Sequence, residues 1–513
     1  MFPTLYFDDD VLLPEEMRSR ALKAASGLAA LGLRAGDAVA VMLRNEPAAM
    51  EVILAARHLG AYWCGLNWHF KAAEANWILE DSAAKVLVVH ADLLDQIAEG
   101  IPAAVRVLVV RPQPLTIRQY RSGETSVACP AGTLEWSSWR ERHQESNEAA
   151  APPRGFMPYT SGTTGRPKGV RRIAPDPAKA EAQRQAAAEV GQVVFGIEPA
   201  SRCLLAAPLY HSAPASYATY CAQVSATLRL EPRFDAERLL GLIEQDRTTH
   251  LYLVPTMYQR LLRLPKAVRE QYDVSSVEFV ASTGSPCPAQ VKQAMIDWWG
   301  PVIHEAYASS ETGYVTFISA PDWLAHPGST GRPIGPAVVR IIGDDGQVKP
   351  AGEVGTIYAR QPAYPDFEYL NDPAARTAME REGLVTLGDM GYVDPEGYLF
   401  ICDRKSDMVI SGGVNIYPAE IEGVLSSMPG VADCAVFGVP DDEWGEALAA
   451  AVQCRDDAVL SEHDVRTFLR QRLAGYKVPK IVAFHASLPR EDTGKIFKRK
   501  LRAPYWEWAG RAV

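Results

Sequence analysis

Residues 159–169 of this 513-residue chain are Tyr159-Thr160-Ser161-Gly162-Thr163-Thr164-Gly165-Arg166-Pro167-Lys168-Gly169. Hydroxyl side chains, glycines and a lysine are interleaved there without the periodicity of a helix or a strand, which predicts a loop. Glycines let backbone N–H groups turn toward a ligand, hydroxyls donate further hydrogen bonds, and the lysine and arginine add positive charge. The stretch therefore predicts a phosphate cradle and a nucleotide site.

Two alternative interpretations of this stretch are weaker. The P-loop pattern needs a glycine before its lysine and a hydroxyl residue after it. Here Pro167 precedes Lys168 and Gly169 follows it, which argues against a P-loop of that kind. A flexible Gly/Ser/Thr linker is the other alternative, but such linkers seldom contain so ordered a mixture of Thr, Pro and Lys.

The composition, 47% hydrophobic and 22% charged residues, is typical of a soluble globular protein. At about 150 residues per domain, the length predicts two to four domains. The net charge of −10 argues against nucleic acid as a partner and favours small molecules.

The N-terminus and the cysteines predict a cytoplasmic protein. Residues 1–10 are acidic and lack the basic start and apolar centre of a signal peptide. No window approaches 18 uninterrupted apolar residues, so we expect no transmembrane segment. The eight cysteines are scattered, without a C-x-x-C pair, as reduced core cysteines are.

The hydrophobic pattern predicts the domain organisation. Strand-like and helix-like segments alternate through the first half, which is typical of an α/β domain with a largely parallel sheet. Residues 121–153 look like a surface connection, and 327–401, with many Gly and Pro, predict a β-rich subdomain. We expect an N-terminal domain over 1–403, a hinge at 404–406 and a small α+β C-terminal domain over 407–513.

The stretch at 159–169 resembles the phosphate-binding loop of the adenylate-forming superfamily, which includes acyl- and aryl-CoA synthetases. Four further segments resemble motifs of this superfamily and occur in its order, near residues 307, 387, 404 and 495. The resemblance covers most of the chain. It implies that a carboxylic acid and ATP form an acyl-adenylate, and that a mobile C-terminal domain then rotates for the second step.

The resemblance implies a set of residues around the nucleotide. Segment 307–312 is similar to the Y-G-x-T-E motif, whose glutamate holds Mg²⁺, and segment 387–392 to the T-G-D motif, whose aspartate binds the ribose. Lys168 and Glu311 are implied as catalytic, and Glu311 also as the metal ligand. The ATP/AMP-binding residues are implied as Thr160, Ser161, Gly162, Thr163, Thr164, Gly165, Lys168, Gly284, Ser285, Pro286, Glu305, Ala306, Tyr307, Ala308, Ser309, Ser310, Asp389 and Arg404.

Further residues are implied in the C-terminal part. Lys495 lies in a segment that resembles the T-G-K motif, so it is implied to bridge the acyl carboxylate and the α-phosphate as a catalytic residue. Ser406 falls where the superfamily has its pivot. The stretch from Ser411 resembles the loop that lines the pantetheine tunnel, which implies Ser411, Gly412 and Gly413 there.

The acyl pocket is implied by a segment, 208–212, that resembles one gating the acid in the superfamily. We expect His211, Thr283, Ser309 and Val315 to line it. These segments contain no charged residue that would demand a polar substrate tail, which favours an apolar or aromatic acid.

The sequence therefore predicts an ATP-dependent acid–CoA ligase that uses ATP, Mg²⁺ and CoA and acts on a fatty or aromatic carboxylic acid. Two alternatives stay open: a stand-alone adenylation enzyme that loads a carrier protein, and a non-catalytic nucleotide-binding homologue. The oligomeric state is open, with a homodimer as one alternative.

Overall fold

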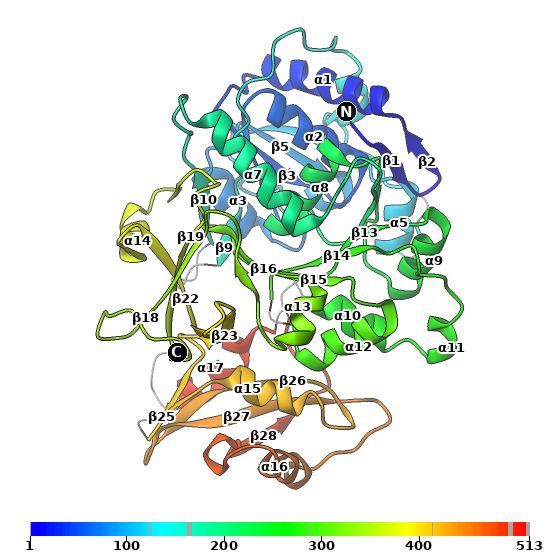
Figure 1. The fold of residues 1–513 in the computed structure, drawn as a ribbon. Coiled ribbons are helices and arrows are strands. Elements are labelled where there is room, and N and C mark those ends of the chain that lie inside the picture. The colour runs from blue at the N-terminus through cyan, green and yellow to red at the C-terminus, as the bar shows by residue number, and fades with distance from the viewer. Residues whose placement is uncertain are drawn as a thin grey trace.

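The computed structural model describes residues 2–121, 123–124, 126–161, 167–285, 287–412, 414–490 and 496–508. Their strands form five sheets, and helices cover the larger ones (Figure 1). The fold is mixed α/β, with parallel-rich sheets, a β-rich subdomain and a small C-terminal domain, and the predicted fold class is confirmed. All eight cysteines are free thiols.

A six-stranded parallel sheet forms the first layer. Alternate residues of its central strand point into different cores, Val39 and Val41 into one and Ala40 and Met42 into the other, so both faces are buried. The strands in spatial order are β7 (Leu134–Glu135), β6 (Arg106–Val110), β5 (Val86–His90), β3 (Ala38–Met42), β4 (Tyr62–Gly65) and β8 (Gly155–Phe156). Its helices are α1 (Pro14–Ala30), α2 (Pro47–His58), α3 (Ala72–Asp81), α4 (Ala91–Leu94), α5 (Pro114–Tyr120) and α6 (Trp136–Arg140).

A nine-stranded mixed sheet forms the second layer, and one continuous hydrophobic core joins it to the first. Its strands in order are β17 (Arg332–Pro333), β16 (Gly313–Ile318), β15 (Ile303–Ser309), β14 (Phe279–Ser282), β13 (His250–Tyr252), β11 (Arg202–Leu205), β12 (Thr227–Leu230), β1 (Thr4–Phe7) and β2 (Asp10–Leu12). Its helices are α7 (Ala180–Phe195), α8 (Ser212–Val224), α9 (Ala236–Asp246), α10 (Pro255–Leu262), α11 (Lys266–Arg269), α12 (Ala289–Trp299) and α13 (Ala320–Ala325).

Two small antiparallel sheets stand beside these layers, at the left of Figure 1. The three-stranded sheet contains β20 (Phe367–Tyr369), β10 (Pro167–Arg172) and β9 (Tyr159–Ser161), and helix α14 (Pro373–Ala378) follows β20. The five-stranded sheet contains β18 (Val338–Ile342), β19 (Gly355–Arg360), β22 (Leu384–Val393), β21 (Glu380–Arg381) and β23 (Leu399–Arg404).

The C-terminal part, orange to red in Figure 1, has its own sheet with a hydrophobic cluster on each face. The long hairpin alternates, so that Val436 packs toward α15 and α16 while Phe437 packs toward α17. Its strands are β25 (Val414–Ile416), β24 (Val409–Ser411), β27 (Gly445–Cys454), β26 (Val431–Asp441) and β28 (Ile481–Phe484). Its helices are α15 (Pro418–Leu425), α16 (Glu462–Arg470), the 3₁₀ turn η1 (Gly475–Lys477) and α17 (Lys498–Trp508).

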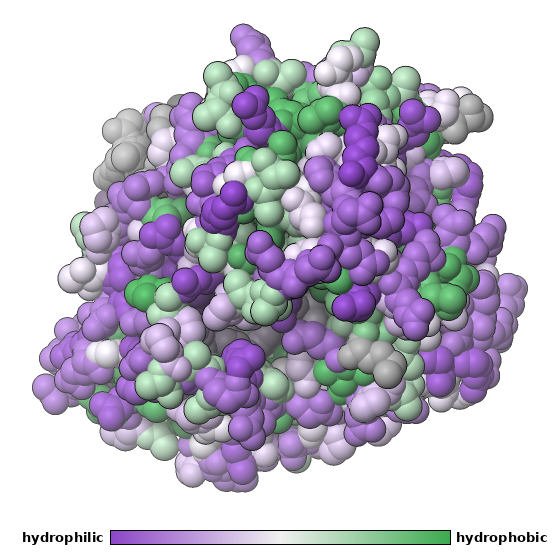
Figure 2. Space-filling view, turned by 90° about the horizontal axis from the view of Figure 1, so that it is seen from above, coloured by the Kyte–Doolittle hydropathy of each residue, from purple (hydrophilic) through white to green (hydrophobic). Residues whose placement is uncertain are grey.

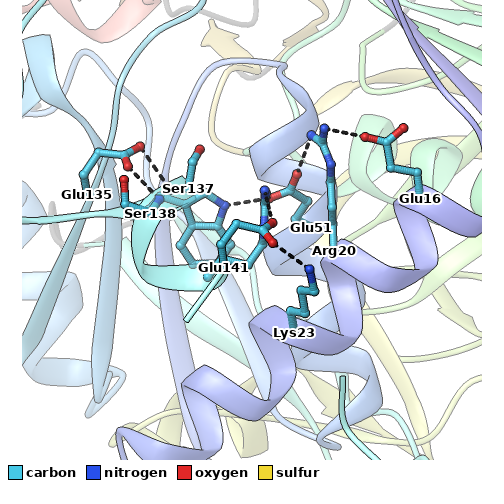
Figure 3. A network of polar contacts seen from close by, with 10 residues as sticks. Glu16, Arg20, Lys23, Glu51, Glu135, Ser137, Ser138 and Glu141 are labelled. Carbon is cyan, nitrogen blue, oxygen red and sulfur yellow. Dashed lines mark hydrogen bonds and ion pairs between the residues drawn. The ribbon is translucent and has the colours of Figure 1, made fainter. Parts of the chain in front are cut away.

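The segment predicted as a surface connection differs from that expectation in its centre. Trp136 and Trp139 of α6 are buried in the large core. Trp136 Nε1 and Arg140 both donate to Glu51 Oε2 at 2.6 Å, and Arg20 reaches Glu51 Oε1 at 3.4 Å (Figure 3). The tryptophans lie three residues apart, on one face of a helical turn, which is why they anchor this connection to α1 and α2.

Apolar side chains are concentrated in these cores. The face seen in Figure 2 is mostly hydrophilic, with hydrophobic residues in smaller patches. Among the helices that the structure describes, none has the length and apolar character needed to cross a membrane.

Candidate active site

The segment predicted as a phosphate loop is built on a hairpin. Strands β9 and β10 pair antiparallel, with Lys168 opposite Thr160 and Pro167 opposite Ser161. The prediction of a loop is therefore wrong for these flanks, because Val170 enters a small core with Phe367 and the backbone of β10 also pairs with β20. The predicted residues Gly162, Thr163, Thr164 and Gly165 lie outside the described residues.

Lys168 points from β10 toward the segment after β20. Its Nζ lies 2.8 Å from Asp372 Oδ2 and 5.5 Å from the centre of the Tyr369 ring. The hydrogen bond from Lys168 lowers the pKa of Asp372, so the carboxylate stays charged. The ammonium group is thus held between a carboxylate and an aromatic face.

Glu311 reaches the same tyrosine from the turn between β15 and β16. Ser309 Oγ accepts hydrogen bonds from the backbone N–H groups of Glu311 (3.2 Å) and Thr312 (2.9 Å), which fixes this turn. The Tyr369 hydroxyl donates to Glu311 Oε1 at 2.8 Å. Burial, together with Glu311, raises the pKa of Tyr369, so the phenol keeps its proton and donates. The structure therefore brings Lys168 and Glu311 to one residue, the first over its ring and the second at its hydroxyl.

The neighbouring turn residues contact α8 and β10. Ser310 Oγ donates to Ser212 Oγ at 3.3 Å, and the Ser310 carbonyl accepts from Arg172 at 2.9 Å. Burial lowers the pKa of Arg172 to about 10, so the guanidinium is still charged at neutral pH. Ala308 pairs with Tyr314 next to an irregularity in the β15–β16 register.

Asp389 and Tyr307 form a second group of predicted residues. The Tyr307 hydroxyl donates to Asp389 Oδ2 at 2.5 Å, and Arg404 Nε lies 3.6 Å from Asp389 Oδ1. Asp389 and Arg404 face each other across the β22–β23 pair, so strand register joins two motifs that are separate in the sequence. A carboxylate with two acceptor oxygens suits a vicinal diol such as a ribose.

The residues predicted near the base follow parallel strands. Thr283, Gly284 and Ser285 come directly after β14, and β14 runs parallel to β15, so these segments meet at one edge of the sheet. Gly284 has a φ of +95°, a conformation that L side chains rarely adopt. Pro286 lies outside the described residues.

Glu305 and Ala306 lie deeper than a ligand-contacting role suggests. Glu305 Oε2 accepts from Lys292 Nζ at 2.9 Å, and both side chains are buried. Ala306 is part of the large hydrophobic core. The carboxylate of Glu305 is thus already paired, and the backbone of this stretch is what remains for a nucleotide.

The four predicted acyl-pocket residues come from three places. His211 precedes α8, with its ring 4.3 Å from that of Tyr210, and the next residue, Ser212, meets the β15–β16 turn through Ser310. Thr283 and Ser309 lie at the carboxyl ends of neighbouring strands, whereas Val315 is fully buried in β16. Of these residues, Ser309 lies at the start of the turn that carries Glu311, and the segment around His211 meets that turn through Ser212 and Ser310.

The predicted hinge residue lies between strands β23 and β24, and the predicted thiol-tunnel residues lie in the C-terminal part. The Ser406 carbonyl accepts a hydrogen bond from Arg502 of α17 at 3.3 Å. Ser411 ends β24, and Gly412 has a φ of +57° with its N–H donating to the Trp444 carbonyl at 2.8 Å. Gly413 and Lys495 lie outside the described residues.

Comparison with protein families identifies this arrangement. A family of AMP-binding enzymes matches residues 14–364, and the family of AMP-binding enzyme C-terminal domains matches 420–495. The chain belongs to the AMP-binding enzyme family. Within the adenylate-forming superfamily it lies in the branch of acyl- and aryl-CoA synthetases, as predicted.

Relatives of this AMP-binding enzyme match along almost all of their length. The chain is 33% identical to the long-chain-fatty-acid–CoA ligase FadD13 of Mycobacterium tuberculosis, over 96% of this chain and 92% of the relative. It is 34% identical to a feruloyl-CoA synthase of Amycolatopsis sp., over 95% and 92%. The structure of the anthranilate CoA ligase AuaEII in complex with anthranoyl-AMP is similar with a TM-score of 0.85 at 25% identity, over 99% of this chain and 95% of that one.

Sequence analysis did not predict the residues that contact the charged groups of this site. Tyr369, Asp372 and Lys292 contact Glu311, Lys168 and Glu305 respectively. Tyr369 and Asp372 lie in a short segment without a glycine-rich phosphate-binding pattern, and their partners are up to 204 residues away. Arg172 could have been proposed from the sequence, because this basic residue lies only three positions after Gly169, where the Lys168 segment ends.

Two cavities lie apart from these residues. One, of about 430 Å³, is lined by residues around the N-terminus of α2 and by α6, and it borders the Glu51 network. The other, of about 450 Å³, lies between α1, α2 and the segment near residue 147. Neither cavity is lined by a predicted site residue.

Proposed function

We propose that this AMP-binding enzyme is an ATP-dependent acid–CoA ligase. The observation that carries the proposal is the meeting of Lys168 and Glu311 at Tyr369, next to a separate carboxylate at Asp389. One group supplies charge for phosphates and the other supplies acceptors for a ribose. The named activities of the relatives, which are CoA ligases or synthases for fatty, ferulic and anthranilic acids, support the same class.

In the first half-reaction an oxygen of the substrate carboxylate attacks the α-phosphorus of ATP. The bond to the β-phosphate oxygen breaks, and pyrophosphate leaves. The lysine and arginine charges of this chain, Lys168 among them, offset the repulsion between a carboxylate and a triphosphate. Lys495, predicted from its motif, would bridge the acyl and phosphate oxygens in the transition state.

Glu311 fits the ligand role for Mg²⁺. The hydrogen bond from Tyr369 uses Oε1, and among the described residues no donor is hydrogen-bonded to Oε2. Mg²⁺ is usually held by one or two carboxylates together with substrate phosphates, so a cage of several protein ligands is not required. When bound, the metal neutralises phosphate charge during adenylation.

In the second half-reaction the thiol of CoA attacks the acyl carbon, and AMP leaves as the carbon–oxygen bond to its phosphate breaks. We propose that the part after residues 404–406 rotates between the two steps. In support, β23 ends at Arg404 and β24 begins at Val409, and the sheet of residues 409–484 is separate from the others. Ser411, Gly412 and Gly413 would then line the path of the thiol arm.

The acid is proposed to be fatty or aromatic. Val315 and Thr283 are buried, and the named segments around His211 bring serine and tyrosine side chains rather than charged groups. A pyrophosphate-release screen over fatty acids of increasing length, benzoates, cinnamates and amino acids, with and without CoA, tests the proposal. We expect acid-dependent release with a fatty or aromatic acid and product thioester only with CoA. Release with amino acids alone, or no release with any acid, would contradict it.

A further inference from the structure

Residues 369–372, between β20 and α14, contact the proposed phosphate site in several ways. We call Tyr369, Leu370, Asn371 and Asp372 the 369–372 segment. Its two outer residues hold Glu311 and Lys168, as described above. Its two inner residues are fixed to the hairpin β9–β10 and to α3.

The inner residues lock the backbone of the segment. The Leu370 N–H donates to the Gly169 carbonyl at 2.9 Å, one residue from Lys168. Asn371, at a φ of +57°, donates through Nδ2 to Asp81 Oδ1 at 2.9 Å. Asp81 Oδ2 in turn accepts from the Tyr159 hydroxyl at 2.9 Å, so the segment and the start of β9 share one carboxylate.

The two carboxylate oxygens of Asp372 have different partners, one in helix α14 and one in the proposed phosphate site. Oδ1 accepts from the Ala375 N–H at 3.0 Å and caps α14, while Oδ2 contacts Lys168. The ammonium group is therefore fixed relative to a helix end, rather than left on a flexible side chain. Lys168 loses rotational freedom before a phosphate arrives, so its charge is held in one geometry when the reaction begins.

Tyr369 fixes the position of Glu311 in the same way, through the hydrogen bond from its hydroxyl. A hydrogen bond to a charged group is stronger than a neutral one, and this bond is made to one carboxylate oxygen. The other oxygen is thereby aimed, since a carboxylate held at one oxygen cannot rotate freely. Lys168 lies over the ring of the same tyrosine, so one side chain contacts both charged groups.

We propose that the 369–372 segment is the positioning half of the phosphate site, in which Tyr369 orients Glu311 toward Mg²⁺ and Asp372 orients Lys168 toward the β- and γ-phosphates. The proposal rests on the proposed function. Neither residue touches the reacting atoms, so both act through the groups they hold.

The first test is Tyr369→Phe, with Tyr220→Phe as the matched control, since the Tyr220 hydroxyl bonds to α7 on the exposed side of α8. ATP binding is measured calorimetrically against Mg²⁺ concentration, beside acid-dependent pyrophosphate release. We expect the Mg²⁺ concentration at half-saturation to rise by roughly 5- to 20-fold. A change of this size corresponds to the loss of one hydrogen bond to a charged group. ATP binding without Mg²⁺ and thioester formation from supplied acyl-AMP should be unchanged. An unchanged Mg²⁺ dependence would overturn the role of Tyr369.

The second test is Asp372→Asn, which keeps the helix cap and removes the charge. Asp235→Asn is the control, because Asp235 caps α9 through the Arg238 N–H at 2.9 Å. We expect single-turnover adenylation to slow by about 10-fold while ATP affinity is kept or improves, because Lys168 stays charged but loses its fixed position. A loss of ATP affinity with an unchanged adenylation rate would overturn the role of Asp372.

Failure of the proposed function is distinguishable from failure of this inference. If the unmodified enzyme releases no pyrophosphate with any acid, the proposed function is wrong. If it releases pyrophosphate and both variants behave as their controls do, the function stands and the positioning role of the segment is refuted.

Discussion

The hydroxyl of Tyr307 donates a hydrogen bond to Oδ2 of Asp389 at 2.5 Å, across 82 residues of sequence. This bond fixes one oxygen of the carboxylate, and Arg404 lies 3.6 Å from the other. Asp389 is therefore a pre-oriented acceptor, ready for hydroxyl groups that lie next to each other on a sugar.

The first prediction concerns nucleotide recognition by this carboxylate. Asp389→Asn keeps the shape of the side chain but replaces one acceptor oxygen by a donor. We expect the KM for ATP to rise at least 10-fold, because a charged hydrogen bond is worth about 1.5–3 kcal/mol. Discrimination between ATP and 2′,3′-dideoxy-ATP, measured as the ratio of kcat/KM, should largely disappear in the variant. A variant that keeps the full discrimination would remove Asp389 from the ribose site.

The second prediction concerns the buried network of Figure 3. Glu51→Ala removes the buried carboxylate that pairs with Arg140 at 2.6 Å, so that among the described residues Arg140 keeps only the exposed Glu141, and it also removes the acceptor of Trp136. Breaking a buried pair on one side costs about 3–5 kcal/mol. We expect a clear fall in the thermal midpoint of the N-terminal part, measured by calorimetry. Glu16→Ala, at the exposed end of the same network, should change it little; equal effects of the two changes would contradict the role of the buried pair.

The third prediction is a pH dependence of stability from His304. Burial is the main cause that lowers its pKa to about 4, and its Nδ1 accepts a hydrogen bond from the Ala320 N–H at 3.2 Å. The ring is stacked on Phe279, with centroids 4.0 Å apart. In the unfolded chain a histidine has a pKa of about 6.5, so between about pH 6.5 and 4 the unfolded state binds a proton that the folded state does not.

Stability contributed by the neutral ring should therefore be full above about pH 6.5 and should fall as the pH drops toward 4. Unfolding midpoints across this range, compared with those of His304→Gln, check the prediction. The variant should lose part of the pH dependence. An NMR titration that places the pKa of His304 at or above its ordinary value would show the prediction to be wrong.

The fourth prediction separates the two half-reactions and rests on the sequence motif around Lys495. Lys495→Ala should nearly abolish acid-dependent pyrophosphate release, because a charge that bridges the acyl and phosphate oxygens is lost. Thioester formation from supplied acyl-AMP and CoA should be largely kept, since that step no longer needs the bridge. Equal loss of both steps would refute the assigned role.

Short sequence motifs explain which site residues could be predicted from the sequence. Lys168, Glu311, Asp389 and Arg404 could be proposed from the sequence because each lies in a short pattern whose residue types suggest phosphate, metal or ribose. The continuous apolar run at 38–42 likewise indicates a strand that is buried on both faces, as β3 is.

The partners of these residues could not be predicted, because strand register and loop conformation decide them. Tyr369 meets Glu311 only because β20 pairs with β10, and Asp372 meets Lys168 only after a turn with Asn371 in the left-handed region. The burial of α6 depends on Glu51, a charged residue of α2 with apolar neighbours on both sides, which local pattern alone would place on the surface.

The most direct test of the proposed function follows the oxygen atoms of the acid. A substrate acid found in the pyrophosphate screen is labelled with ¹⁸O in both carboxylate oxygens and converted with ATP and CoA, and the AMP product is analysed by mass spectrometry. Carboxylate attack on the α-phosphorus predicts one ¹⁸O atom in the phosphate of AMP and none in pyrophosphate. AMP without the label, or ADP as the nucleotide product, would contradict adenylate formation by this chain.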